Sequence, residues 1–119
     1  MKLAITSEGE TEQSPVDPRF GRAKFFIILD TEKQTSVAVP NTINLNAAQG
    51  AGIQAGKKIV ESGADTLITG HVGPKAYATL HAGNIKIYTG ATGTVADAAA
   101  QLQAGKLKAV QSPDVEGHW

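Results

Sequence analysis

The sequence contains no cysteine among its 119 residues. This absence excludes disulfide bonds, thiolate metal sites, thiol nucleophiles and iron–sulfur clusters ligated by the protein. The chain also has no net charge, because 11 basic residues match 11 acidic residues. General nucleic-acid binding requires a basic excess that neutralises phosphates, so we expect no nucleic-acid partner. Any charged site must therefore be local.

Long apolar runs are also absent. No stretch approaches the roughly 20 apolar residues that a membrane-spanning helix requires, so we expect no membrane partner. The opening segment MKLAITSEGE is too short an apolar stretch for a signal peptide, and Glu8 and Glu10 follow at once. We expect a cytoplasmic protein. Its length predicts a single domain with one compact core.

Apolar periodicity and turn residues predict five strands and three helices. Pro74 suits the first turn of a helix, and Thr94 with Asp97 is a weaker variant of the capping box. The strands are expected at residues 2–6, 24–30, 35–39, 66–69 and 85–88, and the helices at 47–62, 74–82 and 94–105.

The order of these elements, β-β-β-α-β-α-β-α, predicts a mixed sheet. A hairpin comes first, and the βαβ units that follow require parallel strands with right-handed crossovers. We therefore expect a three-layer α/β domain over residues 1–107, with helices on both faces of the sheet. Residues 108–119 are expected to form a polar C-terminal tail.

Four loops are expected at the carboxyl ends of the parallel strands, at residues 7–22, 41–52, 70–74 and 89–93. In an open α/β sheet, ligands bind beyond these ends. Three of the loops enter helices, whose N-termini present unpaired N–H groups and about half a positive charge. Three helix ends aimed at one hollow predict an anion site, supplemented by Arg19, Arg22, His71 and Lys75.

The basic residues of these loops can also be interpreted as structural residues that bind no ligand. Arg19 and Arg22 flank Gly21 just before a buried strand, and they either face a ligand or pair with Asp17 and cover the sheet. His71 either binds a metal or an anion, or is a structural loop residue.

Two further motifs are ambiguous. The side chains of Asn44, Asn46 and Gln49 either reach a ligand or cap a helix. The segment GAGIQAG, residues 50–56, looks like a nucleotide fingerprint but has one residue too many and follows a loop. We interpret it as unrelated to nucleotide binding.

Four segments in the same order resemble the nitrogenase iron–molybdenum cofactor biosynthesis family: DPRFGRAKFF, the Asn-rich loop with GAG, TGHVGPKA and YTGATGTV. The resemblance runs from residue 1 to about residue 107 and is to the small-domain type that includes NifX and the C-terminal part of NifB. It implies a ribonuclease-H-like fold with a five-stranded sheet in the order 3-2-1-4-5, strand 2 antiparallel. It also implies a protein that binds and carries metal–sulfur clusters and is not an enzyme.

The free-standing members of this family resemble the chain most in length. Among them is the orange protein of sulfate-reducing bacteria, which holds a molybdenum–copper sulfide cluster without covalent attachment. Such a cluster is anionic and brings its own sulfides, so the protein needs only N–H donors, cations and an apolar wall. The resemblance therefore implies this cluster, or a related molybdenum or iron–sulfur cluster, as a non-covalent cofactor.

The predicted cofactor site has no catalytic residue, and His71 is its candidate metal ligand. The residues expected to bind the cofactor are Arg19, Phe20, Gly21, Arg22, Asn44, Asn46, Gly50, Gly52, Gly70, His71, Val72, Gly73, Gly90, Thr92 and Gly93.

Two other functions remain open. A regulatory or scaffold module would dock its loop edge on an ATPase or on another cofactor-biosynthesis protein. A metal-dependent nuclease or phosphoryl-transfer enzyme would need several carboxylates around a metal pair. Only Asp17, with Glu8, Glu10 and Glu12, lies in a suitable loop, and no acid on a strand supports them.

Overall fold

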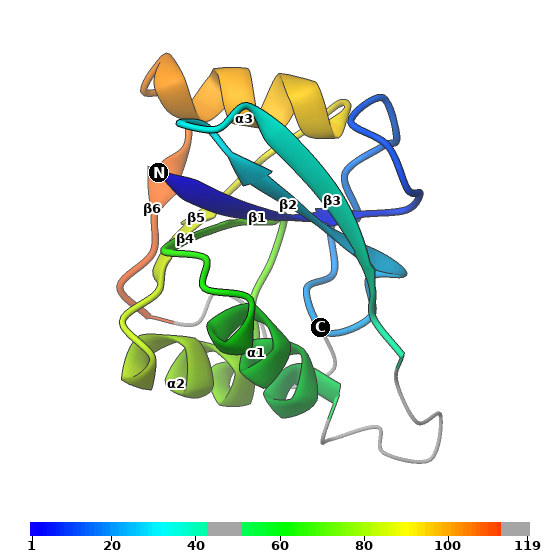
Figure 1. Ribbon diagram of the computed structural model, residues 1–119. Helices are drawn as coiled ribbons and strands as arrows, with labels where there is room; N and C mark the ends of the chain where they lie inside the picture. The colour runs from blue at the N-terminus through cyan, green and yellow to red at the C-terminus, as the bar shows by residue number, and fades with distance from the viewer. Residues whose placement is uncertain (43–50, 113–119) are drawn as a thin grey trace.

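The structure, a computed structural model, describes residues 1–42 and 51–112 of the chain. A mixed sheet lies between two layers of helix (Figure 1). Helix α3 (Val95–Gln103) covers one face of the sheet. Helices α1 (Ala51–Glu61) and α2 (Pro74–Ala82) cover the other face. Helices on both faces are thus what the order of elements predicted.

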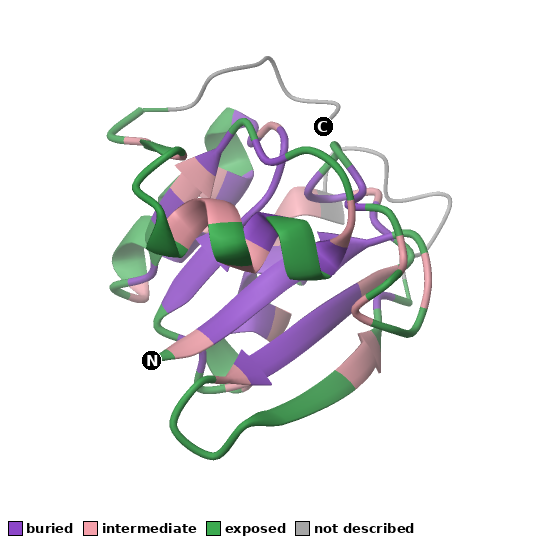
Figure 2. Ribbon diagram, turned by 90° about the horizontal axis from the view of Figure 1, so that it is seen from above, coloured by how far each residue is buried: buried purple, intermediate pink, exposed green. Residues whose placement is uncertain are grey.

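The first 40 residues form an antiparallel unit. Strand β1 (Lys2–Ser7) pairs with β2 (Phe25–Asp30), and β2 pairs with β3 (Thr35–Pro40). Leu3, Ala4 and Ile5 of β1 and the continuous apolar sequence of β2 place both strands in the buried centre of the sheet, whereas β3 is an exposed edge (Figure 2).

The second half builds parallel strands onto β1. Strand β4 (Thr66–Ile68) pairs parallel with β1, and β5 (Lys86–Thr89) pairs parallel with β4. The strand order 3-2-1-4-5 and the antiparallel strand 2 are confirmed. Of the helix expected over residues 47–62, residues 47–50 lie outside the described residues, and the described helix begins at Ala51.

The prediction of five strands is wrong, because the sheet has a sixth. Strand β6 (Lys108–Ala109) pairs antiparallel with β5, and the Val110 amide extends the ladder by donating to Ile87 O at 2.9 Å. Both residues of β6 are exposed, so no apolar run marks the strand in the sequence. The sheet therefore ends on a short antiparallel strand within the segment expected to be a tail.

Two groups of apolar side chains fill the spaces between the layers. Below α3 they are Leu3, Ile5, Val16, Ile27, Leu29, Ile68, Ala91, Val95 and Ala98. Facing α1 and α2 they include Phe20, Phe26, Ile28, Ala55, Ile59, Leu67, Val72, Leu80 and Ile87. In the described ranges, no helix combines the length and apolar character needed to cross a bilayer.

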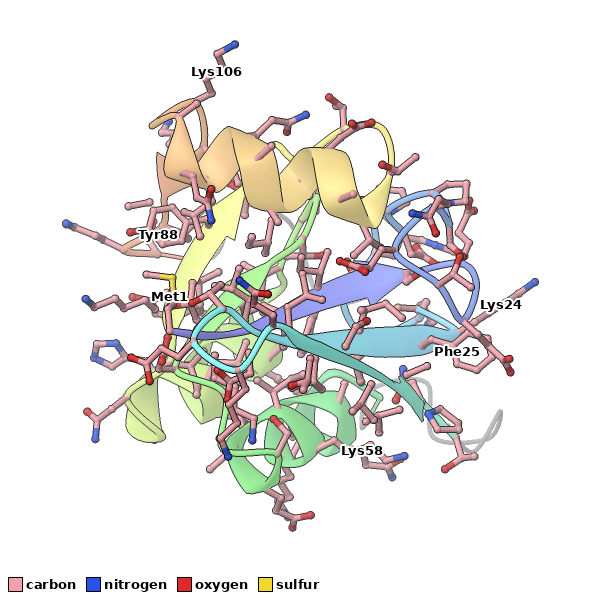
Figure 3. All side chains as sticks on the ribbon, turned by 45° about the horizontal axis from the view of Figure 1, so that its top comes forward. Met1, Lys24, Phe25, Lys58, Tyr88 and Lys106 are labelled. Carbon is pink, nitrogen blue, oxygen red and sulfur yellow. The ribbon has the colours of Figure 1, made fainter. Side chains whose placement is uncertain are left out.

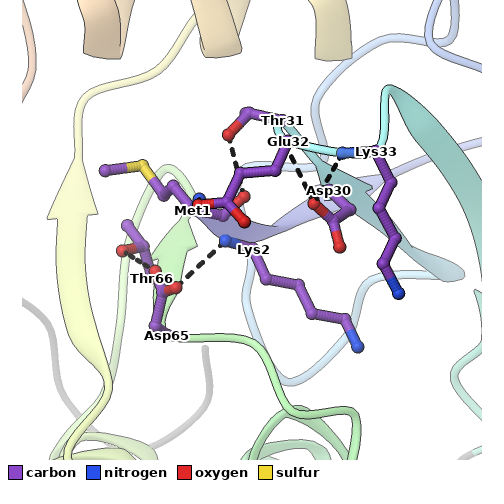
Figure 4. Close-up of polar contacts among 8 residues, drawn as sticks. All are labelled: Met1, Lys2, Asp30, Thr31, Glu32, Lys33, Asp65 and Thr66. Carbon is purple, nitrogen blue, oxygen red and sulfur yellow. Dashed lines mark hydrogen bonds and ion pairs between the residues drawn. The ribbon is translucent and has the colours of Figure 1, made fainter.

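Polar contacts join three strands at the edge where β1 begins (Figure 4). The Lys2 amide donates to Asp65 Oδ2 at 3.0 Å, and Thr66 Oγ1 donates to Asp65 Oδ1 at 2.7 Å. The Thr31 amide donates to Met1 O at 2.9 Å. The opposite edge, where Lys24 and Phe25 lie far from Met1, carries the loops expected to bind a ligand (Figure 3).

Candidate ligand-binding site

The connection between β1 and β2 divides into two halves that serve opposite faces of the sheet. Its first half runs beside α3, where Pro15 forms an isolated bridge with Thr94 and the Val16 amide donates to Gly93 O at 2.9 Å. Its second half crosses to the loop after β4. There Arg19 forms a parallel bridge with His71. The two loops that carry the predicted cations are therefore side by side.

Two backbone hydrogen bonds hold this pairing together. The His71 amide donates to Pro18 O at 2.7 Å, and the Phe20 amide donates to His71 O at 3.3 Å. Gly70 makes the approach possible, because a Cβ at that position would lie 2.6 Å from Pro18 Cα and 2.7 Å from Pro18 O. Only glycine leaves room for the two loops to meet here.

Phe20 anchors the cation-bearing loop in the core. Its side chain is fully buried, and its ring centroid lies 5.7 Å from that of Phe26. Arg19 and Arg22 on either side remain exposed and half-buried, respectively. The buried Phe20 side chain thus anchors this part of the backbone in the core, while Arg19 and Arg22 stay near the surface.

Asp17 pairs with Arg19, as the structural interpretation of these cations anticipated. Asp17 is only 3% exposed, its Oδ1 accepts the Arg19 amide at 3.0 Å, and the same oxygen lies 3.7 Å from Arg19 Nε. The Arg19 side chain is nevertheless 53% exposed, so the pairing orients it without covering it. Thr6 fixes Asp17 in turn, because Thr6 Oγ1 donates to Asp17 O at 2.7 Å.

The first turns of α1 and α2 lie side by side on the same face as this loop. A Cβ on Gly52 would lie 3.1 Å from Ala76 Cβ, and one on Gly56 would lie 2.9 Å from Thr79 Cγ2. Gly52 and Gly56 of the GAGIQAG segment therefore allow the two helices to approach closely. At the start of α2, the N-cap Gly73 offers no side-chain acceptor to the helix.

The start of α3 differs, because the protein itself uses its N–H groups. The expected capping box is present: Thr94 Oγ1 accepts the Asp97 amide at 3.1 Å, and Asp97 Oδ2 accepts the Thr94 amide at 3.0 Å. The next donors are satisfied by the loop before β2: the Val95 amide donates to Ser14 O and the Ala96 amide to Glu12 O, each at 2.9 Å. The expectation that three helix ends converge on one hollow is therefore wrong for α3, whose first amides bind the protein itself.

The predicted site residues therefore divide between the side of α1 and α2 and the side of α3. Gly90 stays beside the site, because its amide donates to Gly70 O at 3.4 Å. Thr92 is bound instead to α3, where Gln101 Nε2 donates to Thr92 O at 2.9 Å, and Gly93 accepts from Val16. Asn44, Asn46 and Gly50 lie outside the described residues. The residues that gather on the α1 and α2 side are Arg19, Phe20, Gly21, Arg22, Gly52, Gly70, His71, Val72 and Gly73.

Two of these residues serve as internal supports, because Phe20 and Val72 are fully buried. Asn41, by contrast, was not among the predicted residues, although its buried amide group binds the backbone around Arg22. Its position directly after the proline that ends β3 is the one signal that could have indicated it.

A ready-made site for a bare metal ion is absent from residues 1–42 and 51–112, where no three His, Cys, Asp or Glu side chains gather. His71 is half-buried and lies beside Arg19. The described side of the site thus has two guanidinium groups, an imidazole and the start of α2, which no side chain caps. Such groups suit an anion better than a cation.

Comparison with known proteins identifies relatives along the whole chain. The chain is 36% identical to the apo form of the orange protein from Desulfovibrio gigas, with a TM-score of 0.91 and 96% of each chain covered. It is 37% identical to a putative NifB protein from Thermotoga, with a TM-score of 0.85 and 98% of each chain covered. An uncharacterized protein of Methanocaldococcus jannaschii is 26% identical over 111 residues, which are 91% of this chain and 90% of that protein.

The resemblance that four sequence segments indicated is confirmed by a family model as well. The model described as dinitrogenase iron-molybdenum cofactor matches residues 1–105, which include β1 to β5 and all three helices. The chain therefore belongs to the dinitrogenase iron-molybdenum cofactor family.

Proposed function

We propose that this protein binds and carries an anionic metal–sulfur cluster, held without covalent bonds where α1 and α2 begin. The observation that carries the proposal is the parallel pairing of Arg19 with His71, which sets two cation-bearing loops beside those helix ends. Membership of the family and likeness to the apo orange protein support a role in cofactor binding or biosynthesis. The ribonuclease-H-like assignment of the fold and a cytoplasmic location are parts of the same proposal.

The chemistry of the donors fits such a cargo. A thiomolybdate-type cluster carries its own sulfide ligands and a negative charge, so it needs no thiolates from the protein. The chain has no cysteine to offer, and its described residues contain no cluster of three metal-binding side chains. Arginine and helix N-termini stabilise an anion through charge and N–H donors. His71 is the candidate for one direct bond to a metal.

Within the proposal, the cargo is a molybdenum–copper sulfide cluster or one related to the iron–molybdenum cofactor. An enzymatic role is not part of it. Asp17 accepts a hydrogen bond from the Arg19 amide and forms an ion pair with the Arg19 side chain, and Glu8 and Glu10 are exposed on the half of the loop that serves α3. These acids do not form the converging set that two-metal chemistry needs.

The test is reconstitution of the purified protein with tetrathiomolybdate and a copper(I) salt. We expect a charge-transfer absorption band that stays with the protein through gel filtration, together with metal contents in a fixed ratio. Binding should also raise the melting temperature, because a ligand at 100 times its Kd stabilises the folded state by about 2.7 kcal/mol. Colour that elutes entirely with the small molecules would refute the proposal.

A further inference from the structure

Asn41 is a buried polar residue at the start of the loop after β3. Its side chain is 7% exposed, and its Nδ2 donates to Ala23 O at 2.8 Å and to Gly21 O at 3.4 Å. Its own amide donates to Lys24 O at 2.9 Å. One residue thus binds three carbonyl groups of the segment that carries Arg22.

The orientation of the Asn41 amide group follows from its partners. Both neighbours of Nδ2 are carbonyl oxygens, and only the nitrogen end of the group can donate. The oxygen end is buried, and no donor among the described residues reaches it. A buried acceptor without a partner costs stability, so this side chain stabilises the fold less than its hydrogen bonds suggest. The hydrogen bonds that Nδ2 donates therefore indicate a role in the local structure of residues 21–23.

That local role concerns the direction of Arg22. Asn41 binds the carbonyl groups of the two residues that flank Arg22, Gly21 and Ala23. Carbonyl oxygens carry partial negative charge and would repel an anion nearby. Bound to Asn41 they stay in the interior, while Arg22 between them is half-buried.

We propose that Asn41 is a positioning residue for Arg22 at the cluster site. It holds the backbone on both sides of the arginine and so keeps the guanidinium preorganised for an anionic guest. Preorganisation raises affinity because less conformational freedom is lost on binding. This inference rests on the proposed function, since it assigns Asn41 to the same site.

A double-mutant cycle tests the proposal, with Kd measured by absorption titration with tetrathiomolybdate and copper(I). Asn41→Ala should weaken binding about tenfold in the wild-type background but less than about twofold in an Arg22→Ala background. The matched control is Ile85→Val, a core truncation at the other end of the sheet, which should lower the melting temperature and leave Kd unchanged. Asn41→Ser, with one hydroxyl donor, should give an intermediate Kd and replaces Asn41→Ala if that variant does not fold.

Amide hydrogen exchange supplies a readout without the cluster. In Asn41→Ala, the segment 20–24 should exchange faster than in the wild type, while amides of β4 and β5 stay unchanged. If the wild type binds no cluster, the proposed function is wrong and this inference falls with it. If the wild type binds but the effects of Asn41→Ala and Arg22→Ala are additive, the proposed function stands and Asn41 is merely structural.

Discussion

Helices α2 and α3 both begin at the loop edge of the sheet, yet the chain caps their starts differently. At α3, Thr94 and Asp97 cap each other, and carbonyl groups of Glu12 and Ser14 take the next two amides. At α2, the N-cap is Gly73, which provides no side-chain cap. The difference teaches that a helix N-terminus beside a predicted site is not for that reason available to a ligand, because at α3 the chain itself accepts from the first amides. The two halves of one loop create this asymmetry.

The largest effect is expected from the cations on the α2 side. Arg19→Gln with Arg22→Gln should weaken cluster binding between about tenfold and a hundredfold, because hydrogen bonds to charged groups are worth about 1.5–3 kcal/mol. Glutamine retains a donor near Asp17, so the melting temperature should change little. Absorption titration measures the first quantity and calorimetry the second.

The matched control removes the same charge elsewhere. Lys33→Gln with Lys108→Gln changes two exposed lysines, one in the β2–β3 turn and one on β6. Equal weakening by both pairs would show that net charge, rather than the α2 side, attracts the cluster.

Gly70→Ala should damage the α2 side through sterics. The new methyl group would meet the Pro18 backbone at 2.6 Å, so the loops must move apart, at a cost of about 1–3 kcal/mol. Binding should weaken as well, because Arg19 is carried by the displaced loop.

Gly105→Ala is the control for this variant, since Gly105 has a positive φ of 72° that disfavours alanine but has open space around it. It should lower stability and leave binding unchanged. Retention of full affinity by Gly70→Ala would contradict the assignment of the site to this pair of loops.

Thr94→Ala, at the start of α3, should lower folding stability and leave cluster binding nearly unchanged. Loss of the capping hydroxyl is expected to cost about 1 kcal/mol of folding stability. Cluster affinity should stay within about twofold of the wild type, because this helix start already donates to the protein's own carbonyl groups. A denaturant melt and a titration together give the answer. A marked fall in affinity would place the ligand against α3 instead.

The smallest effect is expected at the opposite edge of the sheet, where Asp65 lies. Burial opposes ionisation there, but hydrogen bonds from Lys2 and Thr66 and the nearby positive charges lower the pKa of Asp65 below its ordinary value of 3.8. A carboxyl whose pKa is lower in the folded state stabilises the protein above pH 3.8, and this contribution disappears as the pH falls through the folded value.

Asp65→Asn should therefore reduce stability at pH 7 by less than about 1 kcal/mol, since the group is largely exposed to solvent. The difference from the wild type should shrink as the pH falls below 3.8. Melting temperatures across this pH range measure it, and a constant difference at every pH would show that charge is not involved.

Much of the fold could be predicted because its signals are local. The apolar run of β2, the proline at the start of α2 and the capping box of α3 each act within a few residues. Strand β6 could not be predicted, because two exposed residues give no periodicity and are stabilised only by pairing with β5.

The meeting of Arg19 with His71 followed from the rule that loops after parallel strands share an edge. The position of Thr92 and Gly93, on the side of α3, could not be predicted from this rule. The handedness rule for parallel crossovers places α1 and α2, but it does not apply to α3, because β6 is antiparallel to β5. Asn41 was missed since its contacts span about 20 residues of sequence and follow no repeating pattern.

The glycines at positions 52 and 56 have a mechanical consequence. Because these two positions of α1 carry no side chain, Ala76 and Thr79 of α2 pack directly against the α1 backbone, and the two helices should behave as a single rigid body. If the protein carries a cluster as proposed, a hinge between these two helices is not a route for its release.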